Sequence, residues 1–440
     1  MVTGSAALGL ATSAIGPFVR GTGTRAAAPN RADATTIQFM GWGQPSEQEV
    51  FETLIASFEE ANPDVKVDYL LVPPGEFLQK LTTLAAAGDL PDVFYMAADW
   101  FGAWVPKGVL RSMDEFLAEQ DLSDIWPQAL DRYRYDGEVI GRGQLYALPK
   151  DLGPFVHVYN QDLYDQYGVP HPPIDGSWTW DVALEGWAAM TKFGSGGSAE
   201  SFGVGALPLE AAVWSNGADY LNADRTQVTV DDPKFIEALQ FAANLSCEHH
   251  VAPTQSELAS IGAWDMWLQG KIGSFVMGPW DQPTFWTLPF KWDVSPFPAS
   301  PTTGQPANWV GSMGYAVSAE SGHPELAVEL ARFFSASEEG QRMTYQLGQA
   351  VPNLMSMAKG EFLAYEKAPV NRQVFVDAIE KWGRPTLGWY TSNDEWIDEM
   401  GQGMDPVWSC EASAEDWANE SAGKLTETLA KEEQIPTVLS

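Results

Sequence analysis

Tryptophans stand next to acidic or amide side chains at several places where predicted strands end or loops begin. The pairs are Trp42 with Gln44, Trp100 with Asp99, Trp280 with Asp281, and Trp389 and Tyr390 with Asn393 and Asp394. Flat aromatic rings pack against apolar ring faces, and carboxylate or amide groups share hydrogen bonds with hydroxyl groups. Residues of these types can bind a neutral molecule rich in hydroxyl groups, and such binding needs no metal, cofactor or nucleophile.

The first of these residues follow the strands of a predicted α/β domain. From Thr35 to Met96 the sequence has a β-α-β-α-β order, which places parallel strands in one sheet. The predicted strands cover 35–42, 65–72 and 91–96. Ligands of such sheets collect beyond the carboxyl ends of the strands, and the Trp42 and Trp100 pairs fall at two of these ends.

Residues 146–173 predict a passage from one lobe to another. A short apolar run ends at Pro149, the charged pair Lys150 and Asp151 lies in a break, and a strand-like aromatic run begins at Phe155. Asp151 is the residue here that we expect to meet a ligand, whereas Lys150 can equally act as a latch between lobes. A return passage is predicted over 309–317, and a third near 350–360.

These passages divide the chain into two lobes and a leading segment. The first lobe is expected over 35–151 and 313–355, the second over 152–312 and 356–440. Residues 1–34 form an export-signal remnant or a disordered tail, because Met1–Val19 is small and apolar and is followed by small-residue cleavage patterns. We therefore expect an exported protein, periplasmic or at the cell surface, and a monomer.

Composition narrows the function further. The chain has 440 residues and a formal net charge of -34, so a partner with a phosphate backbone is repelled and we expect no nucleic acid. Cys247 and Cys410 lack the spacing of a zinc or redox motif. The sequence leaves open whether the two residues form a disulfide, because it does not show whether their Cβ atoms lie close enough.

The order and spacing of several segments resemble the family 1 extracellular solute-binding proteins, the carbohydrate-binding subunits of ABC importers. The resemblance covers nearly all of residues 35–425 and includes TIQFMGW, KLTTLAAAGDLPDVF, YALPKDLGPFVHVYNQDLYDQYGVPHPP, GKIGSFVMGPW and WVGSMGYAVS. It implies a two-lobed periplasmic-binding-protein-like α/β fold with a multi-segment hinge, and no enzymatic activity. It also implies a carbohydrate ligand that is held in the interlobe cleft and passed to a membrane permease.

The same resemblance implies which segments line the cleft. These are the loops after the first and third strands, the passage at Asp151, the Gly-Pro-Trp loop at Trp280, and Trp309 with Gly311. Trp214, in a polar-aromatic loop, is a further candidate. The continuation of Gly-Pro-Trp as Asp281-Gln282-Pro283 and the many tryptophans over 384–417 leave the identity of the sugar open.

Each candidate has a structural alternative, and the function has rivals. Tryptophans are largely buried in most proteins, so Trp42, Trp100, Trp214 and Trp280 could be core, and Asp151 could cap the strand break. Helical spacing favours packing roles for Trp178, Trp180, Trp187, Trp264 and Trp267. The acidic, tryptophan-rich loops also suit a polyamine, and a pair of carboxylates would suit a glycoside-active enzyme.

Overall fold

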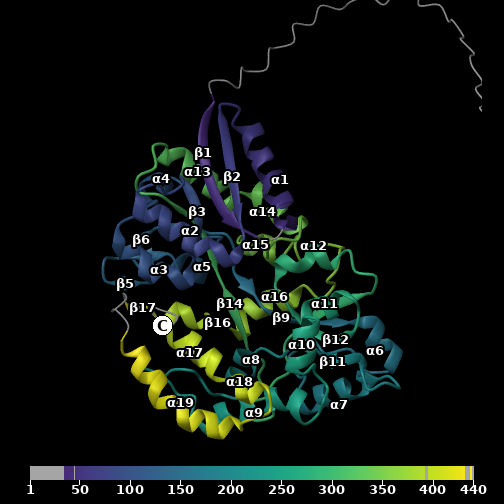
Figure 1. Ribbon diagram of the computed structural model, residues 1–440. Helices are drawn as coiled ribbons and strands as arrows, with labels where there is room; N and C mark the ends of the chain where they lie inside the picture. Colours follow the sequence, from purple (N-terminus) through teal and green to yellow (C-terminus); the bar gives the residue numbers. More distant parts are fainter. Residues whose placement is uncertain (1–33, 44, 392–394, 432–436, 439–440) are drawn as a thin grey trace, which may run out of the picture.

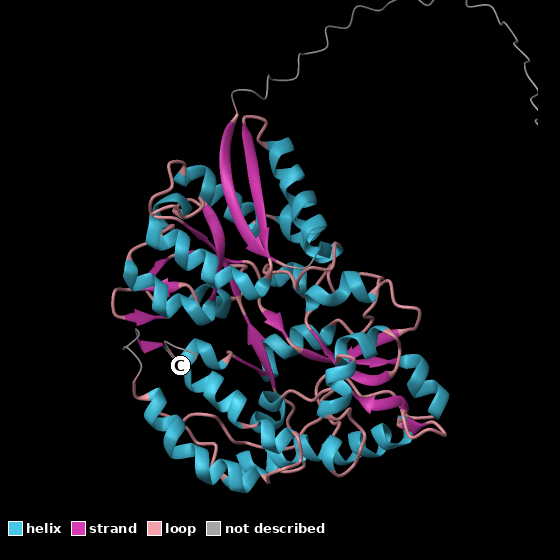
Figure 2. Cartoon of the chain, viewed as in Figure 1, coloured by secondary structure: helices cyan, strands magenta, loops and turns pink. Residues whose placement is uncertain are grey.

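The computed structural model describes residues 34–431 except 44 and 392–394, together with 437–438. Two sheets with helices packed around them form two lobes (Figures 1 and 2). The predicted two-lobed α/β fold is confirmed. Among the helices that the structure describes, none combines the length and apolar character needed to span a bilayer.

The sheet of the first lobe has the order β2-β1-β3-β15-β7. Its strands are β1 (Thr35–Trp42), β2 (Val65–Val72), β3 (Val93–Ala97), β7 (Ala147–Pro149) and β15 (Met313–Val317). The first three are parallel, as the sequence predicts, and β15 runs antiparallel to both β3 and β7. Its main helices are α1 (Pro45–Ala61), α2 (Pro74–Ala87), α13 (Pro324–Ala336) and α14 (Glu338–Gln346).

The sheet of the second lobe has the order β10-β11-β12-β9-β13. Its strands are β9 (Val156–Asn160), β10 (Lys192–Phe193), β11 (Ala199–Val204), β12 (Ile272–Met277) and β13 (Trp292–Ser295). Helices around this sheet are α6 (Gln161–Tyr167), α7 (Trp180–Met190), α11 (Ala263–Leu268) and α12 (Gln282–Phe285). A second helical layer holds α8 (Leu209–Ser215), α9 (Pro233–Cys247), α17 (Glu395–Gly403), α18 (Asp405–Trp408) and α19 (Ala414–Leu429).

Shorter elements connect these layers. They are α3 (Ala98–Trp104), α4 (Asp114–Leu117), α5 (Pro127–Asp131), α10 (Gln255–Ser260), α15 (Met355–Ala358), α16 (Gln373–Asp377), β4 (Arg134–Tyr135), β5 (Val139–Ile140), β6 (Gln144–Leu145) and β17 (Thr437–Val438). β17 falls in the range that the sequence assigns to the second lobe, but it pairs with β5 in the range assigned to the first. The described chain therefore contacts the first lobe again at its end.

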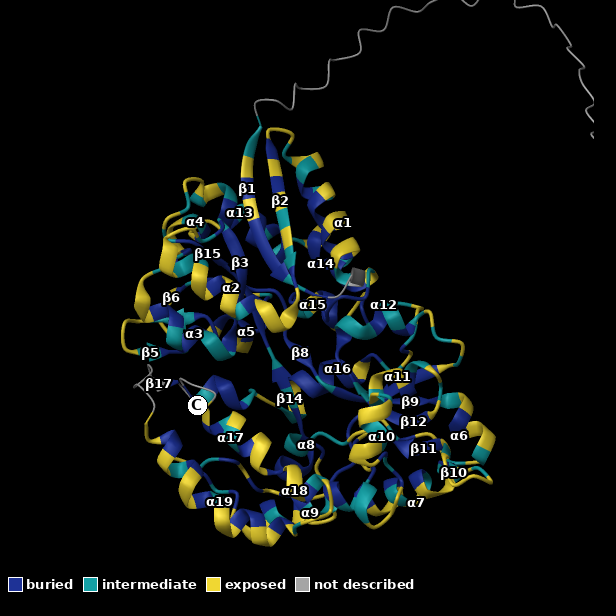
Figure 3. Ribbon diagram, viewed as in Figure 1, coloured by how far each residue is buried: buried dark blue, intermediate teal, exposed yellow. Residues whose placement is uncertain are grey.

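Burial follows the hydrophobic pattern of the sequence (Figure 3). β3 is buried at every position, because helices cover both faces of the sheet. Trp178, Trp180 and Trp187 are buried with 6%, 4% and 1% of their surface exposed, so their predicted packing roles are confirmed. Trp180 and Trp187 lie on α7, where helical spacing follows from packing on one face, whereas Trp178 precedes the helix and is buried from the segment before it.

Three chain segments lie together between the lobes. A small sheet joins β8 (Gly153–Pro154), β14 (Asn308–Gly311) and β16 (Gly383–Arg384), and it lies between the two large sheets (Figure 1). The first passage runs from β7 to β8 and the second from β14 to β15. Asn353, in the third predicted passage, donates hydrogen bonds to the carbonyls of Pro149 (2.6 Å) and Lys150 (3.1 Å). The passages are thus hydrogen-bonded to one another.

Cys247 and Cys410 form a disulfide whose Cα atoms lie 5.6 Å apart. The bond joins the end of α9 to the segment between α18 and α19, and it settles the pairing that the sequence leaves open. Disulfides of this kind stabilise a fold by about 2–5 kcal/mol and persist in oxidising surroundings. The bond therefore fixes the C-terminal helices to the second lobe.

Candidate ligand-binding cavity

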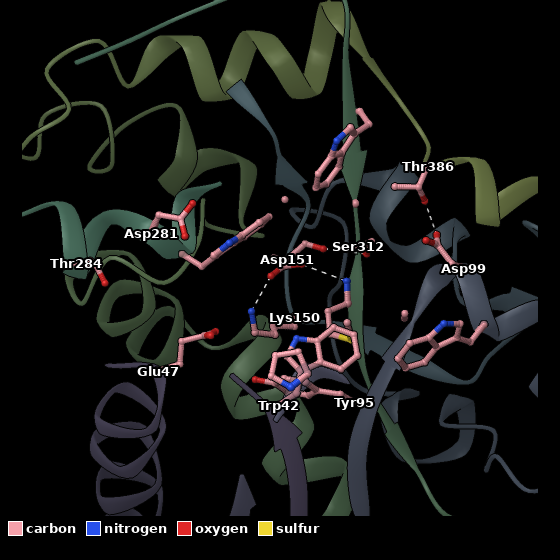
Figure 4. A pocket seen from close by; sticks show the side chains of 18 of the residues that line it. Trp42, Glu47, Tyr95, Asp99, Lys150, Asp151, Asp281, Thr284, Ser312 and Thr386 are labelled. Carbon is pink, nitrogen blue, oxygen red and sulfur yellow. Dashed lines mark hydrogen bonds and ion pairs between the residues drawn. The ribbon is translucent and has the colours of Figure 1, made fainter. Parts of the chain in front are cut away.

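A cavity of about 900 Å³ lies between the lobes, and residues from both lobes and from the passages line it (Figure 4). Its first-lobe side carries Trp42 from the end of β1, Tyr95 from β3 and Trp100 from α3. The indoles of Trp42 and Trp100 meet edge to face, with centroids 5.2 Å apart, and both pack on Phe77 of α2. Because α2 supports them from behind, these rings can present apolar surface to the cavity.

The opposite wall is made of nearly parallel aromatic rings. Trp280 and Trp309 both line the cavity, with centroids 6.5 Å apart and planes inclined by 24°. Phe155 stacks on Trp309 at 4.6 Å and lies 6.4 Å from Trp280. A Cβ at Gly153 would lie 2.7 Å from the Trp280 ring, so glycine is what lets this indole lie against the strand. The wall offers flat apolar surface of the kind that ring-shaped ligands pack against.

The Lys150 and Asp151 pair occupies the centre of the cavity lining. Lys150 Nζ donates to Asp151 Oδ2 at 2.7 Å, and the two residues are only 6% and 5% exposed. Asp151 Oδ1 accepts from the backbone N–H of Met313 at 3.1 Å, and Ser312 donates to the Asp151 carbonyl. Asp151 therefore links the first passage to the second, in addition to facing the cavity.

Two carboxyl groups lie on the same side of the cavity as Thr284 in Figure 4. Asp281 Oδ2 accepts from the backbone N–H of Gly278 at 2.9 Å, and Glu47 Oε1 accepts from Gln349 at 2.8 Å. Burial, and to a smaller degree the charge of Glu47, raise the pKa of Asp281 to about 7. The Asp281 carboxyl group therefore changes its charge near neutral pH.

A third carboxyl group, Asp99, lies at the opposite side of the view beside Thr386, whose hydroxyl donates to it. Burial raises the pKa of Asp99, while the Thr386 hydrogen bond and the positive charge of Arg132 oppose that shift. Arg132 is itself buried and donates to the carbonyl of Val310 on β14 at 2.7 Å. It thereby connects the first lobe to the same strand that carries Trp309.

A buried network fixes the loop that carries Trp280 and Asp281. Gln282 is fully buried and donates to the carbonyl of Pro279 at 2.8 Å. Arg372 donates to Gln282 Oε1 at 2.9 Å and to the carbonyl of Lys367 at 2.6 Å. Because Gln282 is held on both sides, the loop is positioned by the chain that leads from the third passage into α16.

The structure brings eight of the predicted site residues to the cavity: Trp42, Asp99, Trp100, Asp151, Trp280, Asp281, Trp309 and Gly311. Gln44 lies outside the described residues. Their place in the cavity lining supports their proposed role in ligand binding.

Trp214, Trp389 and Tyr390 do not line the cavity, which corrects the expectation that they face it. Trp214 lies on α8 rather than in a loop, is buried, and donates to Asp219 at 3.1 Å.

Trp389 is buried at 7% exposure with the Arg132 guanidinium 5.9 Å from its ring. The ring of Tyr390 lies under Arg225 at 4.1 Å. Gly388 packs against Asp99 and brings the neighbouring Thr386 to the cavity, so Thr386 lines it instead of Trp389 and Tyr390.

The sequence missed several lining residues, namely Glu47, Pro74, Tyr95, Trp264, Thr284 and Thr386. The sequence predicts a packing role for Trp264. Its ring does pack on Phe285, with centroids 5.4 Å apart, yet the residue is 38% exposed and lines the cavity. The signal that could have located Tyr95 is its position near the carboxyl end of β3. No local pattern marks Thr386, because only the packing of Gly388 on α3 brings it near.

Comparisons with known proteins agree with this architecture. The family profile described as bacterial extracellular solute-binding protein matches residues 43–341. An ABC substrate-binding protein of Listeria monocytogenes, solved in complex with cycloalternan, superposes with a TM-score of 0.79 at 25% identity, over 90% of this chain and all of that one.

Matches to curated relatives cover a smaller share of this chain than the structural match does. A binding protein of Brucella abortus is 27% identical over 260 residues, which are 57% of this chain and 60% of that protein, so the match spans about three fifths of the relative. The galactooligosaccharide-binding protein of Bacillus subtilis is 23% identical over 374 residues, covering 80% of each chain.

Proposed function

The chain belongs to the bacterial extracellular solute-binding proteins, and we propose that it captures an oligosaccharide between its lobes and delivers it to an ABC-transporter permease. One observation carries the proposal: indole rings from both lobes surround a single interlobe cavity that also holds carboxyl groups. Indole rings pack on the C–H faces of sugar rings, and carboxylates accept hydrogen bonds from sugar hydroxyls. The names of the Bacillus and Listeria matches support the same ligand class.

The size of the cavity favours more than one sugar ring. Its volume of about 900 Å³ lies near the upper end of the range of roughly 300–1,000 Å³ that is usual for small-molecule sites. Aromatic surface on two facing walls also suits a ligand with several rings. We therefore propose an oligosaccharide rather than a monosaccharide.

The mechanism follows from the position of the cavity between two lobes. A ligand that contacts both lobes stabilises the closed form more than the open form, and it shifts the population by its differential affinity. The passages at Asp151, Ser312 and Asn353 are the segments that change when the lobes move. The closed form then docks on the permease as a monomer outside the cytoplasm, and it performs no chemistry on the sugar.

The test is calorimetric titration of the purified protein with neutral di-, tri- and tetrasaccharides that differ in linkage. We expect saturable binding of at least one member, accompanied by a change in tryptophan fluorescence, because several indoles line the cavity. Chromogenic glycosides should remain unhydrolysed. Saturable binding of a polyamine with no response to any saccharide would contradict the proposal.

A further inference from the structure

The cavity lining is richer in carboxyl groups than in cations. Glu47, Asp99, Asp151 and Asp281 line it together with one ammonium group, that of Lys150. Lys150 is already bound to Asp151 at 2.7 Å in a buried ion pair. Within the described part of the chain, no Lys, Arg or His nitrogen lies within 4.0 Å of the carboxyl oxygens of Asp99 or Asp281. Two cavity carboxyl groups therefore have no ion-pair partner among the residues that the structure describes.

Of the two carboxyl groups without an ion-pair partner among the described residues, that of Asp281 says more about the ligand. Its bond from the Gly278 N–H closes a tight turn, and the side chain still reaches the cavity (Figure 4). Asparagine or serine accepts such a backbone hydrogen bond equally well and carries no charge. Closing the turn therefore does not require an ionisable group in a partly buried aromatic cavity, where a charge is costly.

A carboxylate beside indole rings is a favourable site for a cation. The aromatic faces attract positive charge through their quadrupoles, and the carboxylate supplies the counter-charge and a strong hydrogen-bond acceptor. Building on the proposed function, we propose that the saccharide bound here carries a basic nitrogen, and that Asp281 binds its ammonium group beside Trp280. The neighbouring walls then pack against the rest of the sugar.

The surroundings of Asp281 make this binding depend on pH. Among the described residues, Glu47 on α1 is the charged group that acts on the Asp281 carboxyl group. The Lys150–Asp151 ion pair lines the same cavity, and Arg372 binds the neighbouring Gln282. Burial, followed by the charge of Glu47, raises the pKa of Asp281 to about 7. Below that pH an ammonium ligand must displace the proton, so its observed affinity falls by up to about tenfold per pH unit. A neutral sugar has no such requirement.

The experiment compares matched oligosaccharides on the full chain by calorimetry. The panel contains glucosamine oligomers of two to four units, their N-acetylated forms and the corresponding glucose oligomers with the same linkage, each in α- and β-linked series. At pH 7.5 we expect at least one amino member to bind ten or more times more tightly than its neutral counterparts, and this ratio to fall about tenfold at pH 5.5. If neutral members bind saturably and no amino member exceeds its counterpart, the inference is wrong and the proposed function stands.

Asp281→Asn separates charge recognition from the structure of the turn. Asparagine keeps an oxygen that accepts from the Gly278 N–H, so the turn is retained, and the ratio of amino to neutral affinity should fall to within about twofold of one. Asp121→Asn, which removes an exposed carboxylate elsewhere, controls for net charge and should leave that ratio unchanged. Equal weakening of amino and neutral ligands by Asp281→Asn would show that Asp281 only shapes the loop. Failure of every saccharide to bind would instead overturn the proposed function.

Discussion

Asp151→Ala should lower the free energy of unfolding by about 3–5 kcal/mol, because it leaves the Lys150 ammonium buried without its anion. Both residues are almost fully buried, and Asp151 also accepts the Met313 N–H across the two passages. The same substitution removes a carboxylate from the cavity lining, so ligand affinity should fall as well. Urea unfolding followed by circular dichroism measures the first effect, and calorimetric titration measures the second.

A double-mutant cycle isolates the ion pair. Asp151→Asn keeps an acceptor for the Met313 N–H but loses the charge, and Lys150→Met removes the charge that Asp151 balances. We expect the two changes together to cost clearly less than the sum of the single changes, because the pair is what compensates the burial of each charge. Additive losses, or a loss below about 1 kcal/mol for Asp151→Ala, would indicate a solvent-screened pair.

Trp280→Ala should weaken ligand binding at least about tenfold, which corresponds to roughly 1.4 kcal/mol or more. Its indole is part of the aromatic wall with Trp309 and is partly exposed to the cavity. Because the ring rests on Gly153 at the cavity surface, the melting temperature should change little. Titration calorimetry and thermal melting of the same preparation separate binding from stability.

Trp214→Ala is the matched control, because it removes the same side chain from the buried face of α8. Truncating a buried tryptophan costs about 3–5 kcal/mol of stability, so this variant should melt earlier while its folded fraction keeps the ligand affinity. If Trp280→Ala instead loses stability and retains affinity, the Trp280 indole belongs to the core and not to the binding wall.

The sequence predicts those strands and helices whose local hydrophobic pattern matches their packing in the folded protein. The strands over 35–42 and 65–72 and the buried tryptophans of α7 follow hydrophobic periodicity. The pairing of β17 with β5 was not accessible, because a two-residue strand has no period to detect and depends on contacts made about 300 residues away in the chain.

The residues that line the cavity likewise include some that the sequence predicts and some that it does not. Trp280 and Asp281 are adjacent in the sequence and could be found from residue type alone. Glu47 and Thr386 reach the cavity only because separate elements fold toward it. Trp214 resembled a loop aromatic because a glycine and polar residues follow it, yet the helix continues through Ser215 and turns the indole into the core.

The most direct test of oligosaccharide binding between the lobes is a crystal structure of the protein with the tightest-binding oligosaccharide from the titration panel. We expect density for the sugar in the interlobe cavity, with at least one pyranose ring packed on Trp280 or Trp309 and contacts from both lobes. A saccharide bound elsewhere on the protein, and absent from the cavity between Trp42 and Trp280, would show that this cavity is not the binding site.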